Sequence, residues 1–124
     1  MPRVSGQKKK LLLIREFLLE NTDESHSVTI KDIREHLARN GVSAGYQSVK
    51  EDVELLYDFG MDLEINKSIH VVSREFELPE LKLLVDAVQA SKFITEKKTE
   101  ELTNKLCALC SKHEAGGLKR QIHR

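Results

Sequence analysis

The stretch Thr29–Gly60, TIKDIREHLARNGVSAGYQSVKEDVELLYDFG, decides the fold. Thr29 followed by Asp32 predicts a capped helix start, and Asn40-Gly41 predicts where that helix ends. Ser43 is the expected N-cap of a second helix, which Gly60 terminates. Apolar residues recur at helical spacing in both segments, at Ile30, Ile33 and Leu37 and then at Val49, Val53 and Leu56. We therefore expect two helices joined by a tight turn.

The flanking sequence adds one helix before this pair and a hairpin after it. Residues 7–20 place apolar side chains at helical spacing. Residues 61–65 alternate apolar and acidic, residues 66–68 form a turn, and residues 69–72 are rich in β-branched side chains, which predicts two short strands. Three helices followed by a hairpin is the order of a winged helix-turn-helix, whose second motif helix fits the major groove of DNA.

The C-terminal part predicts a helical extension. One helix is expected over residues 79–92, and another from Thr95 to Ala115-Gly116-Gly117, with residues 118–124 left short, basic and without a packing partner. We expect the apolar stripes of these helices to dimerise the chain: Leu81, Leu84, Val88, Leu102, Leu106 and Leu109. The predicted fold is mainly α with a small β-hairpin, with a winged helix-turn-helix over residues 1–75 and the extension over residues 76–124.

Two stretches resemble the N-terminal part of WYL-domain transcriptional regulators, which carry a DeoR-like winged helix. They are YQSVKEDVELLYDFG at Tyr46–Gly60 and REFELPELKLLVDAVQ at Arg74–Gln89, followed by Ser91–Ile94. The first is similar to the family's recognition helix and the second to its linker. The resemblance implies a DNA-binding transcriptional regulator. Tyr46, Gln47 and Glu51 depart from it, because the family pattern has basic residues at these positions.

The resemblance also bears on effectors. In the family a WYL domain, held to sense ligands, follows the linker, and here the chain stops at Arg124. Either this sequence is a piece of a longer protein, or the natural protein lacks the sensor domain. The apolar residues are already committed to helical stripes and a hairpin, so no small-molecule ligand is expected and DNA binding is expected to be constitutive.

Candidate DNA contacts follow from helical positions. Gln47 can pair with adenine, Ser48 can reach a base or a phosphate, and Lys50 suits a phosphate. The expected set also includes residues of the preceding helix, the turn and the wing: Lys31, Arg34, Ser43, Tyr46 and Lys67. The run Lys8–Lys10 is consistent with either phosphate neutralisation or a solvated surface.

Charge gives no general argument for nucleic acid, because 20 basic residues balance 20 acidic ones. Residues 51–80, however, carry 2 basic and 9 acidic side chains. This acidic segment, with the missing basic residues of the second motif helix, supports a rival hypothesis: a winged-helix protein-interaction or dimerisation module with weak or no DNA affinity. Salt dependence of DNA binding distinguishes the two.

Other functional classes find little support. No Gly-rich phosphate loop or nucleophile motif occurs, so we expect no enzyme. Cys107, Cys110 and His113 have zinc-like spacing but no fourth ligand, so neither a metal nor a cofactor is expected. No apolar run approaches the ~20 residues of a membrane span. Two cysteines do not form the disulfide framework that is typical of small secreted proteins. The expected location is the cytoplasm.

Overall fold

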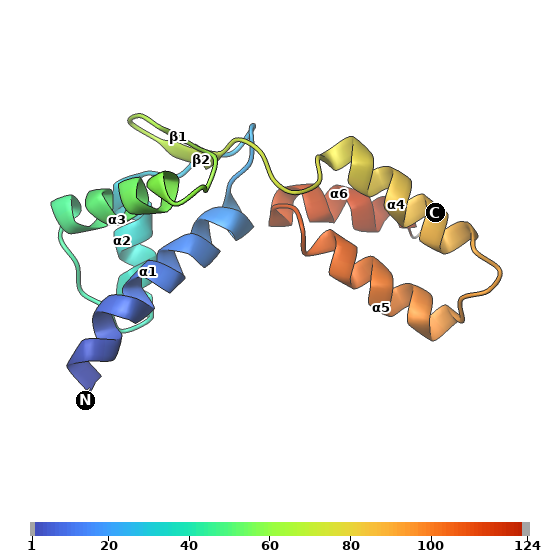
Figure 1. Ribbon diagram of the computed structural model, residues 1–124, viewed down its shortest axis with the longest axis horizontal. Helices are drawn as coiled ribbons and strands as arrows, with labels where there is room; N and C mark the ends of the chain where they lie inside the picture. The colour runs from blue at the N-terminus through green and yellow to red at the C-terminus, as the bar shows by residue number, and fades with distance from the viewer. Residues whose placement is uncertain (1, 123–124) are drawn as a thin grey trace. The chain divides into compact units, whose positions relative to one another are not determined.

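The chain is described by a computed structural model that covers residues 2–122, with side chains for residues 6–120. It is mainly helical with one small antiparallel sheet, as the sequence predicts (Figure 1). The chain divides into two compact units, Met1–Val72 and Ser73–Arg124, called unit 1 and unit 2 below. The sequence predicts this boundary three residues later, after residue 75.

Unit 1 contains α1 (Pro2–Asn21), α2 (Ile30–Arg39), α3 (Tyr46–Asp58), β1 (Leu63–Ile65) and β2 (Ile69–Val71). The predicted capping box at the start of α2 is confirmed: the Thr29 hydroxyl accepts from the Asp32 amide at 3.1 Å, and the Asp32 carboxylate accepts from the Thr29 amide at 2.9 Å. The predicted cap of α3 is wrong, because Gly45 and not Ser43 occupies the N-cap position.

Two glycines make the turns around α3 possible. Gly41, which follows α2, has φ +79°, and Gly60, which follows α3, has φ +112°. Both values lie where a side chain is strained, so both positions favour glycine. The chain can therefore reverse direction within a few residues, which brings α3 back against α2 and α1.

The hairpin closes one edge of the unit 1 core. Leu63 pairs with Val71 and Ile65 with Ile69, so alternate side chains face inward. Val28 extends the pairing, because its backbone exchanges hydrogen bonds of 2.9 and 2.7 Å with Ile69. Residues from every element share one buried core: Ile14, Leu18, Val28, Ile30, Ile33, Leu37, Val49, Val53, Leu63, Ile69 and Val71.

Unit 2 contains α4 (Leu78–Ala90), α5 (Glu96–Cys107) and α6 (Lys112–Ile122). Thr95 caps α5 as predicted, since its hydroxyl accepts from the Lys98 amide at 3.1 Å. Figure 1 shows α4 and α5 running in opposite directions, and α5 contacts both α4 and α6.

The predicted end of the last helix is wrong. The helix from Thr95 stops at Cys107, and α6 then runs through Gly116 and Gly117. Glycine in a helix costs roughly 1 kcal/mol relative to alanine. Leu118 offsets this cost because it is 1% exposed and packs in a core with Leu81, Cys107 and Cys110. The segment expected to lack a packing partner therefore completes the core of unit 2.

Among the residues that the structure describes, no helix is both long enough and apolar enough to cross a membrane.

Candidate nucleic-acid interface

The first two turns of α3 pack against the core on one side and are exposed to solvent on the other. Val49 and Val53, on the inner side of α3, are fully buried. Tyr46 is 57% exposed and Gln47 is also exposed. Gly45 offers no side-chain cap, so the first amides of α3 stay available to an acceptor from outside. The helix start can therefore present both side chains and amides to a ligand.

Lys10 corrects the expectation for the basic run at the start of α1. Its side chain is only 5% exposed, and its Nζ lies 3.0 Å from Asp52 Oδ2. The same Nζ donates to the Ser48 hydroxyl. Lys10 is therefore a structural clamp between α1 and α3 and does not face a phosphate, whereas Lys8 and Lys9 are exposed.

The predicted base-reading residues separate into different roles. Ser48 is half-buried and its hydroxyl accepts from Lys10, so its oxygen is already used within the chain. Gln47 is exposed, with its Nε2 3.5 Å from Glu51 Oε2 on the next turn. That separation is long for a hydrogen bond, so the Gln47 amide can turn to another partner. Lys50 is half-buried on the flank of α3.

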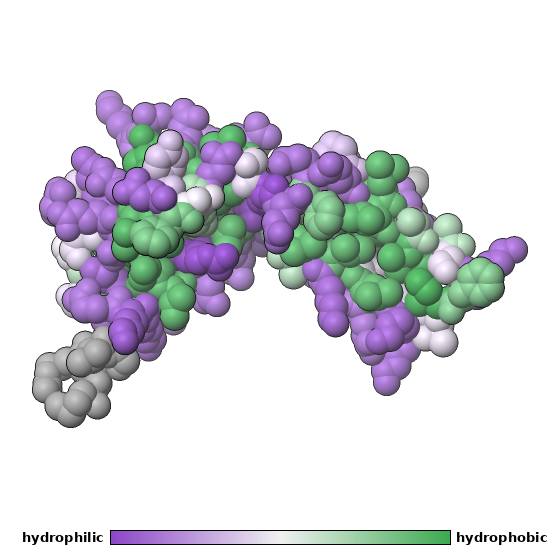
Figure 2. Space-filling view, viewed as in Figure 1, coloured by the Kyte–Doolittle hydropathy of each residue, from purple (hydrophilic) through white to green (hydrophobic). Residues whose placement is uncertain are grey.

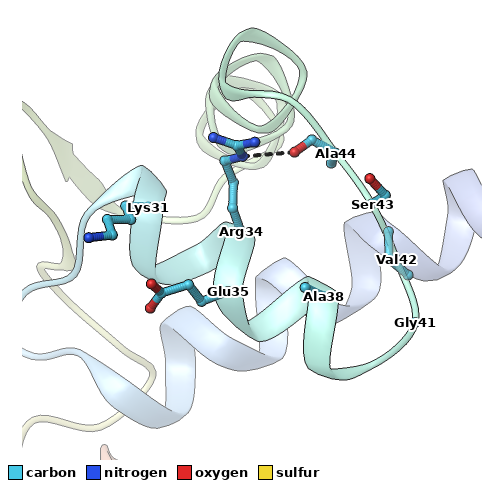
Figure 3. Close-up of a pocket in the computed structure, with 8 residues that line it drawn as sticks. All are labelled: Lys31, Arg34, Glu35, Ala38, Gly41, Val42, Ser43 and Ala44. Carbon is cyan, nitrogen blue, oxygen red and sulfur yellow. Dashed lines mark hydrogen bonds between the residues drawn. The ribbon is translucent and has the colours of Figure 1, made fainter.

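A shallow hollow of about 380 Å³ lies beside α2 and the turn that follows it (Figure 3). Lys31, Arg34 and Ser43, three of the predicted DNA contacts, line it together. Arg34 Nε donates to the Ala44 carbonyl at 2.8 Å, which fastens the turn to α2. The guanidinium therefore holds the α2–α3 connection in place while it stays exposed to solvent.

The hairpin turn carries one exposed cation among acids. Lys67 is exposed, and its neighbour Asn66 donates from Nδ2 to Glu64 Oε2 at 3.1 Å. Asp62 and Glu64 are exposed on the same hairpin. A phosphate at Lys67 therefore meets mixed charge and not a basic patch.

The exposed side of α3 is acidic from Glu51 onward. Glu51, Glu54 and Asp58 are exposed and follow one another at helical spacing. Close approach of a phosphate to these residues is unfavourable, because carboxylates and phosphates repel. Since Glu51 lies one turn from Gln47, this repulsion begins at the edge of the open helix start.

One titratable group of unit 1, His36, has a shifted pKa. The His36 ring on α2 stacks on Phe17 of α1, with centroids 4.5 Å apart. Burial lowers the pKa of His36 and Arg39 lowers it further, while Glu20 and Glu16 oppose the change. His36 is thus held toward its neutral form as part of the α1–α2 contact.

The residues expected to dimerise the chain do not form one surface. Leu81 is fully buried inside unit 2 and is closed to any partner. Val88, Leu102 and Leu106 are half-buried, whereas Leu84 and Leu109 are 36% and 37% exposed. Much of the predicted stripe therefore builds the unit's own core.

The two cysteines belong to that same core. Cys107 and Cys110 are free and buried, and burial raises the pKa of the Cys107 thiol. Cys110 Sγ donates to the Cys107 carbonyl at 3.3 Å, which fixes the end of α5. In the part of the chain that the structure describes, no three His, Cys, Asp or Glu side chains group in a way that can hold a metal ion.

Sequence reasoning missed the clamp residues Lys10 and Asp52, although one signal was present. Lys10 precedes Ile14 by four positions, and Ile14 precedes Leu18 by four, so all three share a helix face. Ile14 and Leu18 are fully buried. A lysine in line with such residues requires a buried partner.

Comparisons with known protein families, curated proteins and solved structures give no match for this chain.

Proposed function

We propose that unit 1 is a winged helix-turn-helix that binds double-stranded DNA, and that the protein is a transcriptional regulator. In this proposal α3 enters the major groove, α2 crosses the phosphate backbone, and the β1–β2 hairpin is the wing. The element order and the short α2–α3 turn support it. The resemblance of Tyr46–Gly60 to a WYL-regulator recognition helix points the same way.

The observation that carries the proposal is the rigid, open start of α3. Val49, Val53 and the Lys10 clamp fix this helix against α1, while Tyr46 and Gln47 project outward. Side chains that recognise DNA bases must project from a firmly held helix, because small displacements break bidentate hydrogen bonds. Lys31 and Arg34 are residues of α2, the preceding helix, and line the hollow beside it, where a phosphate strand would pass.

Selection from a random duplex library, followed by fluorescence anisotropy with the enriched sequence, tests the proposal. The logarithm of the binding constant should fall linearly with the logarithm of salt concentration. Gln47→Ala should weaken binding by ~1–3 kcal/mol and relax the preference at one base pair. Lys31→Ala should weaken all duplexes about equally and reduce the salt slope by about 1.

Glu35→Ala is a matched control, because Glu35 is exposed on α2 close to Lys31 and carries the opposite charge. Removing it should leave affinity unchanged or raise it. If no duplex is enriched, or if Gln47→Ala changes neither affinity nor preference, α3 does not read DNA.

The acidic side of α3 favours a second candidate function, a protein-interaction module with little DNA affinity. Glu51, Glu54 and Asp58 repel a phosphate backbone, and Phe59 at the end of the helix is 85% exposed. An acidic surface with an apolar residue suits a basic amphipathic partner. Absence of salt-dependent DNA binding by the folded protein would favour this function.

A further inference from the structure

The helix α4 has apolar residues on its outer side as well as on its buried inner side. Its inner side carries Leu81 and Val85, which are fully buried within unit 2. Its outer side carries Leu83, which is 71% exposed, and the exposed Ala87 and Ala90. A helix on a protein surface ordinarily has polar residues opposite its buried side, so a largely exposed leucine followed by two exposed alanines at that place is unusual. Figure 2 shows hydrophobic residues gathered over unit 2.

The outer residues form a continuous stripe. Leu83, Ala87 and Ala90 follow at spacings of four and three, so they lie on one helix face. Lys82 and Asp86 lie along one flank of this stripe, and Leu84 along the other. The exposed Glu80 lies at the N-terminal end of the same face, where its carboxylate accepts from the Glu77 amide at 2.8 Å as part of the capping box. We call Leu83, Leu84, Ala87 and Ala90 the outer stripe.

We propose that the outer stripe is a dimer interface at which α4 packs antiparallel against α4 of a second copy of this chain. A twofold axis between Leu84 and Val85 brings Leu83 of one copy within one residue, about 1.5 Å along the helix, of the level of the partner's Ala87. A large side chain then faces a small one on both sides of the axis, which allows close packing. Leu84 meets its own counterpart near the axis.

The charges on α4 are also self-complementary in this arrangement. A twofold axis perpendicular to two antiparallel helices places the same flank of each helix together. Lys82 then lies within one residue of the level of the partner's Asp86, and the symmetry creates a second such pair. Parallel packing about an axis along the helices would instead bring opposite flanks together, so Lys82 and Asp86 would face the partner's Leu84 flank and both charge pairs would be lost.

The residues that flank α4 are also placed favourably by the same twofold axis. Phe76 precedes α4 and is 40% exposed, and Phe93 follows it and is 98% exposed. The axis sets the segment carrying Phe76 beside the partner's segment carrying Phe93. Two such contacts extend the apolar surface beyond the outer stripe, and aromatic residues are enriched at interfaces.

Sedimentation equilibrium of the full chain without DNA tests the interface, and it does so whether or not unit 1 binds DNA. At micromolar concentrations the mass should be twice the 14.2 kDa of one chain. Leu83→Glu should raise the dimer dissociation constant about 100-fold, because it places a carboxylate in an apolar contact on both copies. Leu12→Glu is the matched control, since Leu12 is 63% exposed on α1 of unit 1, and it should leave that constant unchanged.

A charge exchange distinguishes this interface from any other that involves α4. Lys82→Glu alone and Asp86→Lys alone each create like-charged contacts, so each should raise the dissociation constant roughly tenfold. Mixing the two variants should restore dimerisation, because Glu at 82 in one copy meets Lys at 86 in the other. Circular dichroism shows whether each variant keeps its helices.

Each outcome decides the proposal. A wild-type mass of one chain, or a folded Leu83→Glu variant that dimerises like the wild type, overturns the interface. Failure of the mixed variants to dimerise better than either alone overturns the antiparallel arrangement. Restoration by mixing supports it even if Leu83→Glu fails to fold.

Discussion

Replacing Lys10 with Met removes the ammonium group that links α1 to α3 and keeps a side chain of similar length. Asp52 and the Ser48 hydroxyl on α3 then lose their partner on α1. Breaking a fully buried ion pair by removing one member costs about 3–5 kcal/mol. Asp52 is 21% exposed and keeps some contact with water, so we expect the free energy of unfolding to fall by about 2–3 kcal/mol.

The double variant Lys10→Met, Asp52→Leu separates the pair from the rest of the packing. It removes both charges, and replacing a buried ion pair by apolar side chains often leaves the free energy of unfolding unchanged. We expect it to be more stable than Lys10→Met alone, with a coupling energy of about 2 kcal/mol between the two positions. Lys9→Met is the matched control, because Lys9 is exposed one position earlier, and it should change stability by less than about 0.5 kcal/mol.

The measurement can follow unit 1 alone within the intact chain. The protein has two tyrosines and no tryptophan, and both Tyr46 and Tyr57 lie on α3. Tyrosine fluorescence during urea unfolding therefore reports on unit 1, so unfolding of unit 2 does not distort the curve. Unfolding of Lys10→Met at the same urea concentration as the wild type would contradict this prediction. So would a double variant whose loss of unfolding free energy equals the sum of the losses in Lys10→Met and Asp52→Leu.

Two further predictions concern the α1 contacts. Thr22→Val should cost about 1–3 kcal/mol in unfolding free energy, because the buried Thr22 hydroxyl donates to the Leu18 carbonyl at 2.8 Å and accepts from the Val71 amide at 2.9 Å. Thr22→Ser keeps both bonds and should lose clearly less in the same urea experiment. The folded state lowers the pKa of His36, so the unfolded state binds more protons near pH 6 and stability should fall as the pH drops through about 6.5. Melting temperatures of wild type and His36→Phe measured from pH 7.5 to 5 should therefore diverge, and parallel curves would contradict the role given to His36.

The sequence by itself determined the features that depend on near neighbours. Thr29 with Asp32 and Thr95 with Lys98 are three positions apart, so the helix starts could be predicted from their side chains alone. Gly41 and Gly60 marked turns because only glycine adopts their positive φ without strain. Alternation of apolar and polar residues likewise predicted the hairpin.

Tertiary structure alone decided which side chains are available to a partner. Lys10 and Ser48 are 38 positions apart, and only the packing of α1 on α3 shows that Lys10 is neither a phosphate contact nor a solvated side chain but a buried clamp. Leu118 is buried because α6 returns to the core of unit 2, which also carries the helix through two glycines. Leu81 and Leu83 are both apolar residues of α4, yet one is enclosed and the other 71% exposed. Capping depends on atoms within one helical turn, whereas burial depends on contacts between distant segments, which a local pattern does not contain.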